Sequence, residues 1–318
     1  MKNFLCLSFL LISLQALAVK TKVVVALDGS GDFTSIQEAV NSFRDFFPNG
    51  RAEIYIKNGV YREKVVIPSW KTNITLIGES KEETIIAWSD YSGKGDINTF
   101  TSYTVLVKGN DCIIKNLTIT NDAPLNSGQA VALHVEGDRF VIKDCKLIGN
   151  QDTLFTGIGN SRQYFKDCYI EGTTDFIFGP ATVVFDNCHI HCKKNSYITA
   201  ANTPEEHAYG LVFLGGKVTY AAEADRMYLG RPWRDYAKTV FIRTDLGDHI
   251  RPEGWHNWRR PEAEKTSFYA EYKCTGASAE RAQRVGWSYE LSDAQAANYT
   301  LEQIFGGTSP WNPKQLLN

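Results

Sequence analysis

Neither sign of charge is in excess in this sequence. Its 34 lysines and arginines are balanced by 36 aspartates and glutamates, which leaves a formal net charge of −2 over 318 residues. A protein that binds nucleic acid or a membrane surface through its overall field needs an excess of basic charge. The composition therefore predicts neither of these partners. It also requires any polyanionic substrate to be held by local contacts.

Long hydrophobic runs are absent beyond the N-terminal residues. There, Lys2 is followed by a mostly apolar stretch at 4–14, and Ala16-Leu17-Ala18 offers the small residues that a signal peptidase recognises. A buried N-terminal helix is the alternative. We interpret residues 1–18 as a signal peptide cleaved near Ala18, with no membrane span after it. A secreted or periplasmic protein is therefore expected.

Linkers and low-complexity segments are also missing, so nothing in the sequence indicates a second domain. With 43% hydrophobic residues, the chain has ample apolar material for one large core. We expect residues 19–318 to form a single domain and the mature protein to be a monomer.

Four six-residue segments share one pattern, in which apolar, polar, polar, small apolar, polar and apolar residues precede a turn. They are residues 114–119, 142–147, 165–170 and 185–190. Their fourth positions, separated by 28, 23 and 20 residues, are Leu117, Cys145, Cys168 and Cys188. Such a unit cannot bury its own apolar face, whereas stacked units can. Repeats of this length, with no helix between their β-runs, predict a parallel β-helix.

The cysteines fit an interior ladder better than a set of disulfides or a metal site. A free cysteine behaves as a small hydrophobe, and a domain of this size is stable without disulfides, although pairing stays open. The run 188–192 reads Cys-His-Ile-His-Cys. In a strand its cysteines point to one face and its histidines to the other, so the four cannot converge on one ion. We expect no metal.

Helix signals occur near both ends of the chain. Residues 34–37, Thr-Ser-Ile-Gln, predict an amphipathic helix that residues 48–50, Pro-Asn-Gly, close. Residues 298–306 predict a short helix that starts at Thr300. A solenoid must cover its open ends, so both helices are expected to act as caps. Between 201 and 224 the weaker periodicity predicts longer surface loops.

Two aspartates occupy the same place in successive repeats. Asp152 follows Cys145 by seven residues, and Asp175 follows Cys168 by seven. Equivalent positions on neighbouring turns of a parallel β-helix are about 5 Å apart. Two carboxyl groups at that distance retain a proton between them, which suits a nucleophile that works beside a general acid. A row of exposed turn aspartates is the alternative.

Three more polar residues support a reaction at this place. Gln151 adjoins Asp152, and Gln129 lies 22 residues earlier, about one turn away. Side-chain amides can donate hydrogen bonds to an oxyanion without adding charge, although solvated glutamines would look the same. Arg231 can hold a carboxylate and lower its pKa, and a structural salt bridge is the alternative.

Over nearly its whole length after the signal segment, the chain resembles the pectin methylesterase family. Five blocks occur in the family's order, at residues 59–63, 129–133, 151–154, 175–179 and 229–233, with a less close match at 99–102. The resemblance implies an all-β, right-handed parallel β-helix with short capping helices and no cofactor. It also implies hydrolysis of methyl esters of polygalacturonate, with methylesterified homogalacturonan as the substrate.

The matched motifs imply a role for each residue. Asp175 would be the nucleophile and Asp152 the general acid, later the base. Gln129 and Gln151 would form the oxyanion hole, and Arg231 would orient Asp175. Contacts to substrate are implied for Trp233, Phe178, Trp255, Phe100, Phe155 and Thr99. For Phe100 and Phe155, packing against other side chains is the alternative.

Four other functions share parts of this pattern. A glycoside hydrolase also uses paired carboxylates, but glycosidic cleavage forms no oxyanion for the glutamines to stabilise. A calcium-dependent lyase needs a carboxylate cluster and a basic proton abstractor, which the motif region does not show. A non-catalytic carbohydrate-binding β-helix has no use for the aspartates, glutamines and arginine together. A relative that cleaves another ester remains compatible with them.

Overall fold

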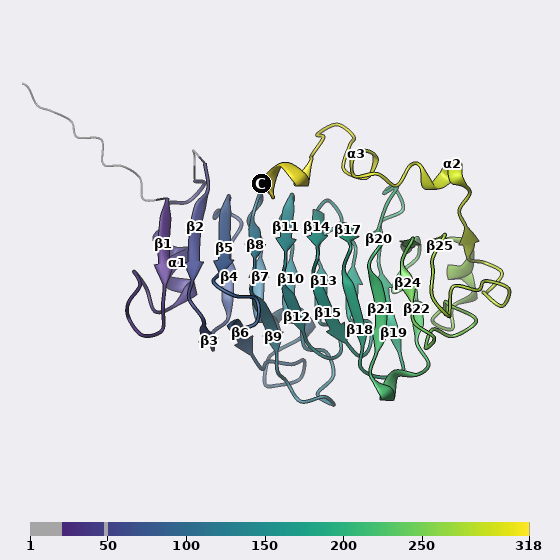
Figure 1. Cartoon of the computed structure of the whole chain (residues 1–318), viewed down its shortest axis with the longest axis horizontal. Coiled ribbons are helices and arrows are strands. Elements are labelled where there is room, and N and C mark those ends of the chain that lie inside the picture. Colours follow the sequence, from purple (N-terminus) through teal and green to yellow (C-terminus); the bar gives the residue numbers. More distant parts are fainter. Residues whose placement is uncertain (1–20, 48–49, 318) are drawn as a thin grey trace, which may run out of the picture.

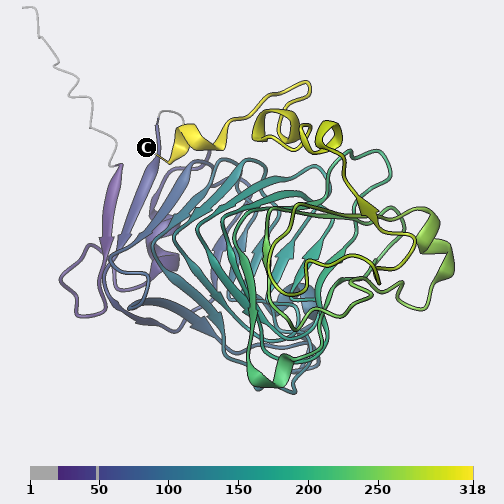
Figure 2. The same ribbon diagram turned by 45° about the vertical axis from the view of Figure 1, so that its right-hand side comes forward.

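The computed structural model describes residues 21–47 and 50–317. The predicted signal peptide at 1–18 lies outside the described residues. Within them the chain winds as a right-handed parallel β-helix, in which successive turns add strands to three parallel sheets (Figure 1). The turned view in Figure 2 shows these coils enclosing a common interior. No helix in the described part of the chain is long and apolar enough to cross a membrane.

The strands belong to three sheets. The eleven-stranded sheet contains, in spatial order, β1 (Lys22–Val25), β2 (Ala52–Ile56), β5 (Ile74–Gly78), β8 (Ile113–Lys115), β11 (Phe140–Lys143), β14 (Arg162–Lys166), β17 (Thr182–Asp186), β20 (Leu211–Leu214), β23 (Lys238–Ile242), β25 (Phe268–Tyr272) and β26 (Tyr289–Glu290). The eight-stranded sheet contains β3 (Gly59–Tyr61), β6 (Thr84–Trp88), β9 (Thr118–Asn121), β12 (Lys146–Ile148), β15 (Tyr169–Gly172), β18 (His189–Cys192), β21 (Lys217–Tyr220) and β24 (Asp245–Leu246). The seven-stranded sheet contains β4 (Val65–Ile67), β7 (Val105–Val107), β10 (Leu133–Val135), β13 (Leu154–Thr156), β16 (Ile177–Gly179), β19 (Tyr197–Ala201) and β22 (Tyr228–Gly230).

The predicted repeat is the corner between the eleven-stranded and eight-stranded sheets. Four successive strands of the larger sheet are followed by a left-handed residue with φ between 53° and 55°: Asn116, Asp144, Asp167 and Asn187. Asparagine and aspartate tolerate this conformation because their short polar side chains bond locally. The next residue turns into the core, and the exposed fractions are 0%, 0%, 1% and 3% at Leu117, Cys145, Cys168 and Cys188. The interior cysteine ladder is confirmed, and its cysteines are free.

Strand β18 alternates as predicted. Ile190 and Cys192 are buried, whereas His189 and His191 are half-buried on the opposite face. Both imidazoles contact the Thr219 hydroxyl, at 2.6 and 2.8 Å. The cysteines and histidines of this strand therefore point away from one another.

The N-terminal helix forms but is shorter than predicted. Helix α1 (Ile36–Ser42) begins after Ser35, whose hydroxyl accepts a hydrogen bond from the Glu38 N–H at 3.3 Å. It ends well before Pro48 and contacts β1, β2 and β4, where it covers the first turns. The remaining helices are short: α2 (Asp293–Ala296), α3 (Leu301–Ile304), and the 3₁₀ turns η1 (Thr99–Thr101), η2 (Ala222–Ala224), η3 (Pro261–Lys265) and η4 (Pro313–Leu316).

The C-terminal helix begins at its predicted cap, Thr300, but does not cover the open end of the solenoid. The C-terminal segment runs back along the outside of the eleven-stranded sheet (Figure 1). Ile304 and Phe305 pack on an outward apolar row formed by Ile113, Val141, Tyr164, Val184 and Val212. The prediction of a C-terminal helical cap was therefore wrong. Instead, Val285 and Trp287, from an irregular segment after β25, pack against the core near this end.

Candidate active site

A cleft of about 310 Å³ lies on the seven-stranded sheet. An aligned row of outward side chains runs beneath it, in which Phe155, Phe178 and Ala200 are neighbours on β13, β16 and β19. Of these three, Phe178 and Ala200 line the cleft. The cleft brings together all predicted site residues except Phe155 and Trp255: Thr99, Phe100, Gln129, Gln151, Asp152, Asp175, Phe178, Arg231 and Trp233. Residues separated by more than a hundred positions therefore meet because the turns stack in register.

The two aspartates stand side by side on adjacent turns. Leu154 pairs with Ile177, and this register also aligns Asp152 with Asp175. Both aspartates adopt left-handed backbone conformations, with φ of 66° and 48°. Their backbone N–H groups donate to Thr174 O at 3.1 Å and to Tyr197 O at 2.8 Å, respectively. The predicted equivalence of the two positions is thus present in the fold.

Burial and mutual repulsion favour a proton on this pair. The exposed fractions are 7% for Asp152 and 6% for Asp175. Burial raises the pKa of Asp152 well above its usual value, and the charge of Asp175 raises it further. Burial also raises the pKa of Asp175, although hydrogen bonds and charge from Arg231 oppose that rise. Since only Asp175 has a bidentate cationic partner, Asp152 is the better site for the shared proton.

Arg231 holds Asp175 with two parallel hydrogen bonds. Its Nε donates to Oδ1 at 2.9 Å, and its Nη2 donates to Oδ2 at 2.6 Å. The backbone N–H of Arg231 donates to Thr199 O at 2.9 Å, which attaches the residue to β19. A bidentate pair fixes the plane of the carboxylate as well as its charge. Sequence reasoning expected a lowered pKa for Asp175; Arg231 acts in that direction, but burial outweighs it.

The two glutamines also lie on adjacent turns. Gln129 and Gln151 form an isolated parallel bridge, and Ala130 N donates to Gln151 O at 3.0 Å. Both side chains are half-buried and line the cleft beside Asp152. An amide at each of two neighbouring positions can supply N–H donors to one oxygen atom.

Aromatic rings form much of the rest of the cleft. Phe178 stacks on Phe155 with ring centres 4.7 Å apart, and Trp233 meets Phe178 edge-on at 5.7 Å. Phe155 is 8% exposed and lies outside the cleft lining, in contact with Phe100 at 5.1 Å. Phe155 thus supports the floor, whereas Phe100, 44% exposed on η1, faces the opening.

Trp258, and not Trp255, lines the cleft together with Phe178 and Trp233. Trp255 is 1% exposed, pairs with Gly230 across an isolated bridge, and stacks on Tyr269 in the core at 4.5 Å. Its ring therefore cannot stack on a sugar in the cleft. Trp258 lies three residues later and lines the cleft. Sequence reasoning missed it, because the run Gly-Trp-His-Asn-Trp at 254–258 does not show which tryptophan turns inward.

Asn121 is a second residue that sequence reasoning missed. Its buried Nδ2 donates to the carbonyls of Asp90, Ser102 and Val131 at 2.8 to 3.0 Å. One amide therefore ties together the loop before η1, the end of η1 and the segment after Gln129. An asparagine at the end of a strand carries no local signal that distinguishes such a hub from a turn residue.

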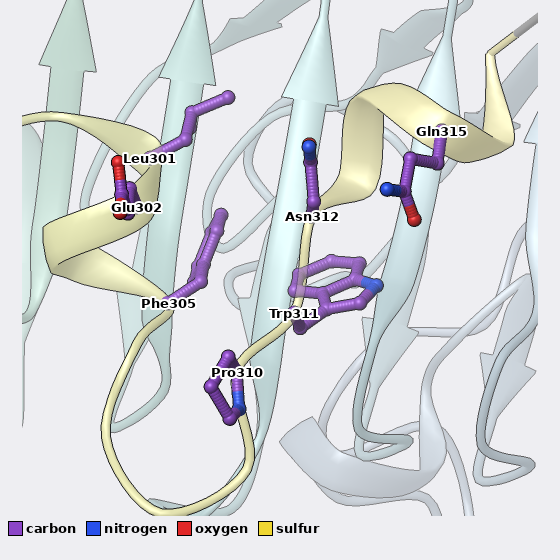
Figure 3. A pocket seen from close by; sticks show the side chains of 7 residues that line it. All are labelled: Leu301, Glu302, Phe305, Pro310, Trp311, Asn312 and Gln315. Carbon is purple, nitrogen blue, oxygen red and sulfur yellow. The ribbon is translucent and has the colours of Figure 1, made fainter.

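A separate cavity of about 360 Å³ lies on the C-terminal segment (Figure 3). Phe305 and Trp311, with ring centres 4.8 Å apart, form its apolar part. Glu302 is the single acid among its lining residues. It offers no acid pair and no bound arginine, so the paired-carboxylate chemistry belongs to the cleft on the seven-stranded sheet.

Comparisons with known sequences agree on one family. The family model described as Pectinesterase matches residues 22–308. Pectinesterase 31 of Arabidopsis thaliana is 39% identical over 296 residues, which cover 89% of this chain and 92% of the relative. Putative pectinesterase 11 of the same plant is 39% identical over 293 residues, covering 90% of this chain and 80% of the relative.

Solved structures give the same result. Carrot pectin methylesterase superposes with a TM-score of 0.84 at 35% identity, covering 89% of this chain and 92% of the relative. The pectin methylesterase of Erwinia chrysanthemi gives 0.77 at 32% identity, covering 91% and 98%. A pectin methylesterase mutant in complex with a hexasaccharide gives 0.78 at 31% identity, with the same coverage. This chain therefore belongs to the pectinesterase family, the carboxylic ester hydrolases that remove methyl esters from pectin.

Proposed function

We propose that this enzyme hydrolyses methylesterified homogalacturonan with Asp175 as the nucleophile and Asp152 as the general acid and base. The observation that carries the proposal is the asymmetry of the aspartate pair. Asp175 receives two hydrogen bonds from Arg231, which favour its ionised form and oppose the effect of burial on its pKa, whereas the neighbouring Asp152 has a strongly raised pKa and no such partner among the described residues. One group is thereby prepared to attack and the other to donate a proton.

The reaction then follows in two halves. An Asp175 oxygen attacks the ester carbonyl carbon, and the developing oxyanion accepts hydrogen bonds from the amides of Gln129 and Gln151. The carbon–oxygen bond to the methoxy group breaks, and Asp152 gives its proton to that oxygen, so methanol leaves. Asp152, now a carboxylate, takes a proton from water as the water attacks the acyl-enzyme. Asp175 leaves as a carboxylate, and Asp152 is protonated again.

The surroundings of the pair fit a sugar substrate. Phe178, Trp233 and Trp258 line the cleft with aromatic rings against which galacturonate can pack, and Thr99 and Phe100 line it as well. The related enzyme in complex with a hexasaccharide supports an extended polysaccharide as the ligand. The net charge of −2 supplies no attractive field for a polyanion, so these local contacts have to select the substrate.

Product analysis tests the reaction type. Highly methylated pectin should release methanol, while reducing ends and unsaturated uronides in the same sample stay at the level of an enzyme-free control. New reducing ends would indicate a glycoside hydrolase, and unsaturated uronides would indicate a lyase. Either signal in place of methanol would contradict the proposal.

Replacing Arg231 by glutamine should move the acidic limb of the kcat/KM profile to higher pH. Asp175 must be ionised to attack, so activity falls as the pH drops through its pKa. Arg231 lowers that pKa, and an opposite charge at this distance commonly accounts for about 1–3 pH units. Exposed Arg226 offers the matched control, Arg226→Gln. An unmoved acidic limb in Arg231→Gln would show that Arg231 does not set the ionisation of Asp175.

We also propose that cleavage near Ala18 leaves residues 19–318 as one secreted or periplasmic catalytic domain, acting as a monomer. The apolar stretch at 4–14 and the small residues at 16–18 support this proposal. N-terminal sequencing of the exported protein should begin near residue 19, and light scattering should give the mass of one chain. An intact N-terminus or a dimer mass would contradict the corresponding part.

A further inference from the structure

The guanidinium of Arg231 lies between two aromatic rings. Its Cζ is 3.5 Å from the centre of the Trp258 ring and 3.9 Å from the centre of the Tyr197 ring. Aromatic faces attract a cation, and two facing rings restrict how the guanidinium can turn. We call these two rings the aromatic clamp. The clamp fixes the direction in which Arg231 presents its two donors to Asp175.

The Tyr197 side of the clamp rests on regular structure. Tyr197 pairs with Tyr228 between β19 and β22, and their rings stack at 5.3 Å with an interplanar angle of 11°. The Tyr197 carbonyl also accepts the hydrogen bond from Asp175 N at 2.8 Å. This half of the clamp is therefore built into the same sheet that carries the nucleophile.

The Trp258 side rests on a turn that is held by side chains. Trp258 and Arg259 both have left-handed backbones, with φ of 57° and 59°, which non-glycine residues adopt only when their surroundings require it. Trp258 N donates to His256 Nδ1 at 3.0 Å, and Arg259 N donates to Asn257 Oδ1 at 2.8 Å. The position of the Trp258 ring thus depends on an acceptor atom of a titratable residue.

His256 can accept this bond only while its ring is neutral. In the neutral ring the proton must then sit on Nε2, because Nδ1 is the acceptor. Protonation would place an N–H on Nδ1 facing the Trp258 N–H, and the turn would lose its hydrogen bond. The imidazole itself has little freedom, because it packs on the Tyr197 and Tyr228 rings at 5.4 and 5.3 Å.

The charges around His256 are cationic. Burial lowers the pKa of His256, and Arg231, Arg259 and Arg251 lower it further. The two tyrosines packed on it are the other titratable groups that face its ring. These neighbours keep the imidazole neutral at near-neutral pH, where Nδ1 can accept.

We propose that His256 is a positioning residue for catalysis, whose neutral Nδ1 holds the Trp258 turn so that the aromatic clamp keeps Arg231 aligned on Asp175. The proposal rests on the assignment of Arg231 as the partner of the nucleophile. It adds an acid-sensitive step: when His256 takes up a proton, the Trp258 side of the clamp is released. Turnover at acidic pH then falls for two reasons, protonation of Asp175 and loss of the clamp.

The test compares three variants on methylated pectin over a range of pH. His256→Asn keeps an acceptor that can bond the N–H two residues later, as Asn257 does, but it does not titrate. His256→Ala removes the acceptor, and His207→Asn changes a histidine outside the cleft. We expect His256→Ala to lower kcat about tenfold at neutral pH, the usual effect of one lost hydrogen bond. KM should rise as well, because Trp258 also lines the cleft. His256→Asn should keep kcat near the wild-type value at neutral pH and show a shallower acidic limb, whereas His207→Asn should match the wild type.

Two results would overturn the proposal. A wild-type kcat in folded His256→Ala would show that the acceptor does not matter, and identical acidic limbs in His256→Asn and wild type would show that its protonation does not matter. Thermal unfolding of each variant separates loss of fold from loss of alignment. Failure of the underlying assignment has a different signature, because folded Asp175→Asn would then retain turnover whatever His256 does.

Discussion

Asp175→Asn is expected to abolish methanol release, with kcat reduced by about 10⁴-fold or more, as for the loss of other covalent nucleophiles. Asparagine retains the size of the side chain and tolerates the left-handed backbone at this position, where φ is 48°. It cannot form the acyl-enzyme at a useful rate, because an amide is a far weaker nucleophile than a carboxylate. The measurement is methanol release at saturating pectin.

Asp144→Asn provides the matched control for this experiment. Asp144 also has a left-handed backbone, with φ of 53°, but it lies in the repeat corner and its side chain is 46% exposed. Its variant should keep wild-type turnover and a similar melting temperature. Substantial turnover by a folded Asp175→Asn protein would overturn the nucleophile assignment, since the same backbone change has been controlled for.

The second large effect is expected for Gln151→Ala. Loss of one oxyanion donor commonly lowers kcat by about 10²–10³-fold. KM should change little, because the bond strengthens only when negative charge develops on the carbonyl oxygen. Gln151 also donates to Asp152, which lowers the pKa of that carboxyl. The basic limb of the pH profile should therefore move to higher pH in the variant.

Gln283→Ala, at an exposed position away from the cleft, is the control for that substitution. Steady-state kinetics give kcat and KM, and the Gln129→Ala variant shows whether both amides serve the same oxygen. If they do, the double variant should lose less than the product of the two single losses. An unchanged kcat in Gln151→Ala would remove this residue from the oxyanion hole.

The repeat and the acid pair could be predicted from sequence because both depend on local spacing. The corner residues at 116, 144, 167 and 187 need a left-handed conformation, and only a few residue types adopt it at low cost. Once these corners are aligned, the equal seven-residue distances to Asp152 and Asp175 place the two carboxyl groups side by side. The in-register pairing of β13 with β16 keeps these equivalent positions adjacent in the fold.

Other features depend on contacts that the local sequence does not encode. The longer surface loop predicted between 201 and 224 is present at 202–210. The same stretch also contains β20 and β21, which the repeat pattern did not reveal because Gly215-Gly216 takes the place of the Asn/Asp-Cys corner. The C-terminal helix was located at Thr300, but its packing surface depends on the distant outward row that includes Tyr164. Likewise, the local sequence does not show that Trp255 pairs with Gly230 and is buried, whereas Trp258 lines the cleft.

The assignment of Asp175 as nucleophile and Asp152 as general acid is tested most directly by finding which of the two carries the shared proton. Infrared difference spectra at neutral pH should show a protonated carboxyl group in the wild type, because burial and Asp175 both raise the pKa of Asp152. That signal should disappear in Asp152→Asn and persist in Asp144→Asn. If it persists in Asp152→Asn, or if the wild type has no protonated carboxyl group, Asp152 is not the acid and the proposed mechanism is wrong.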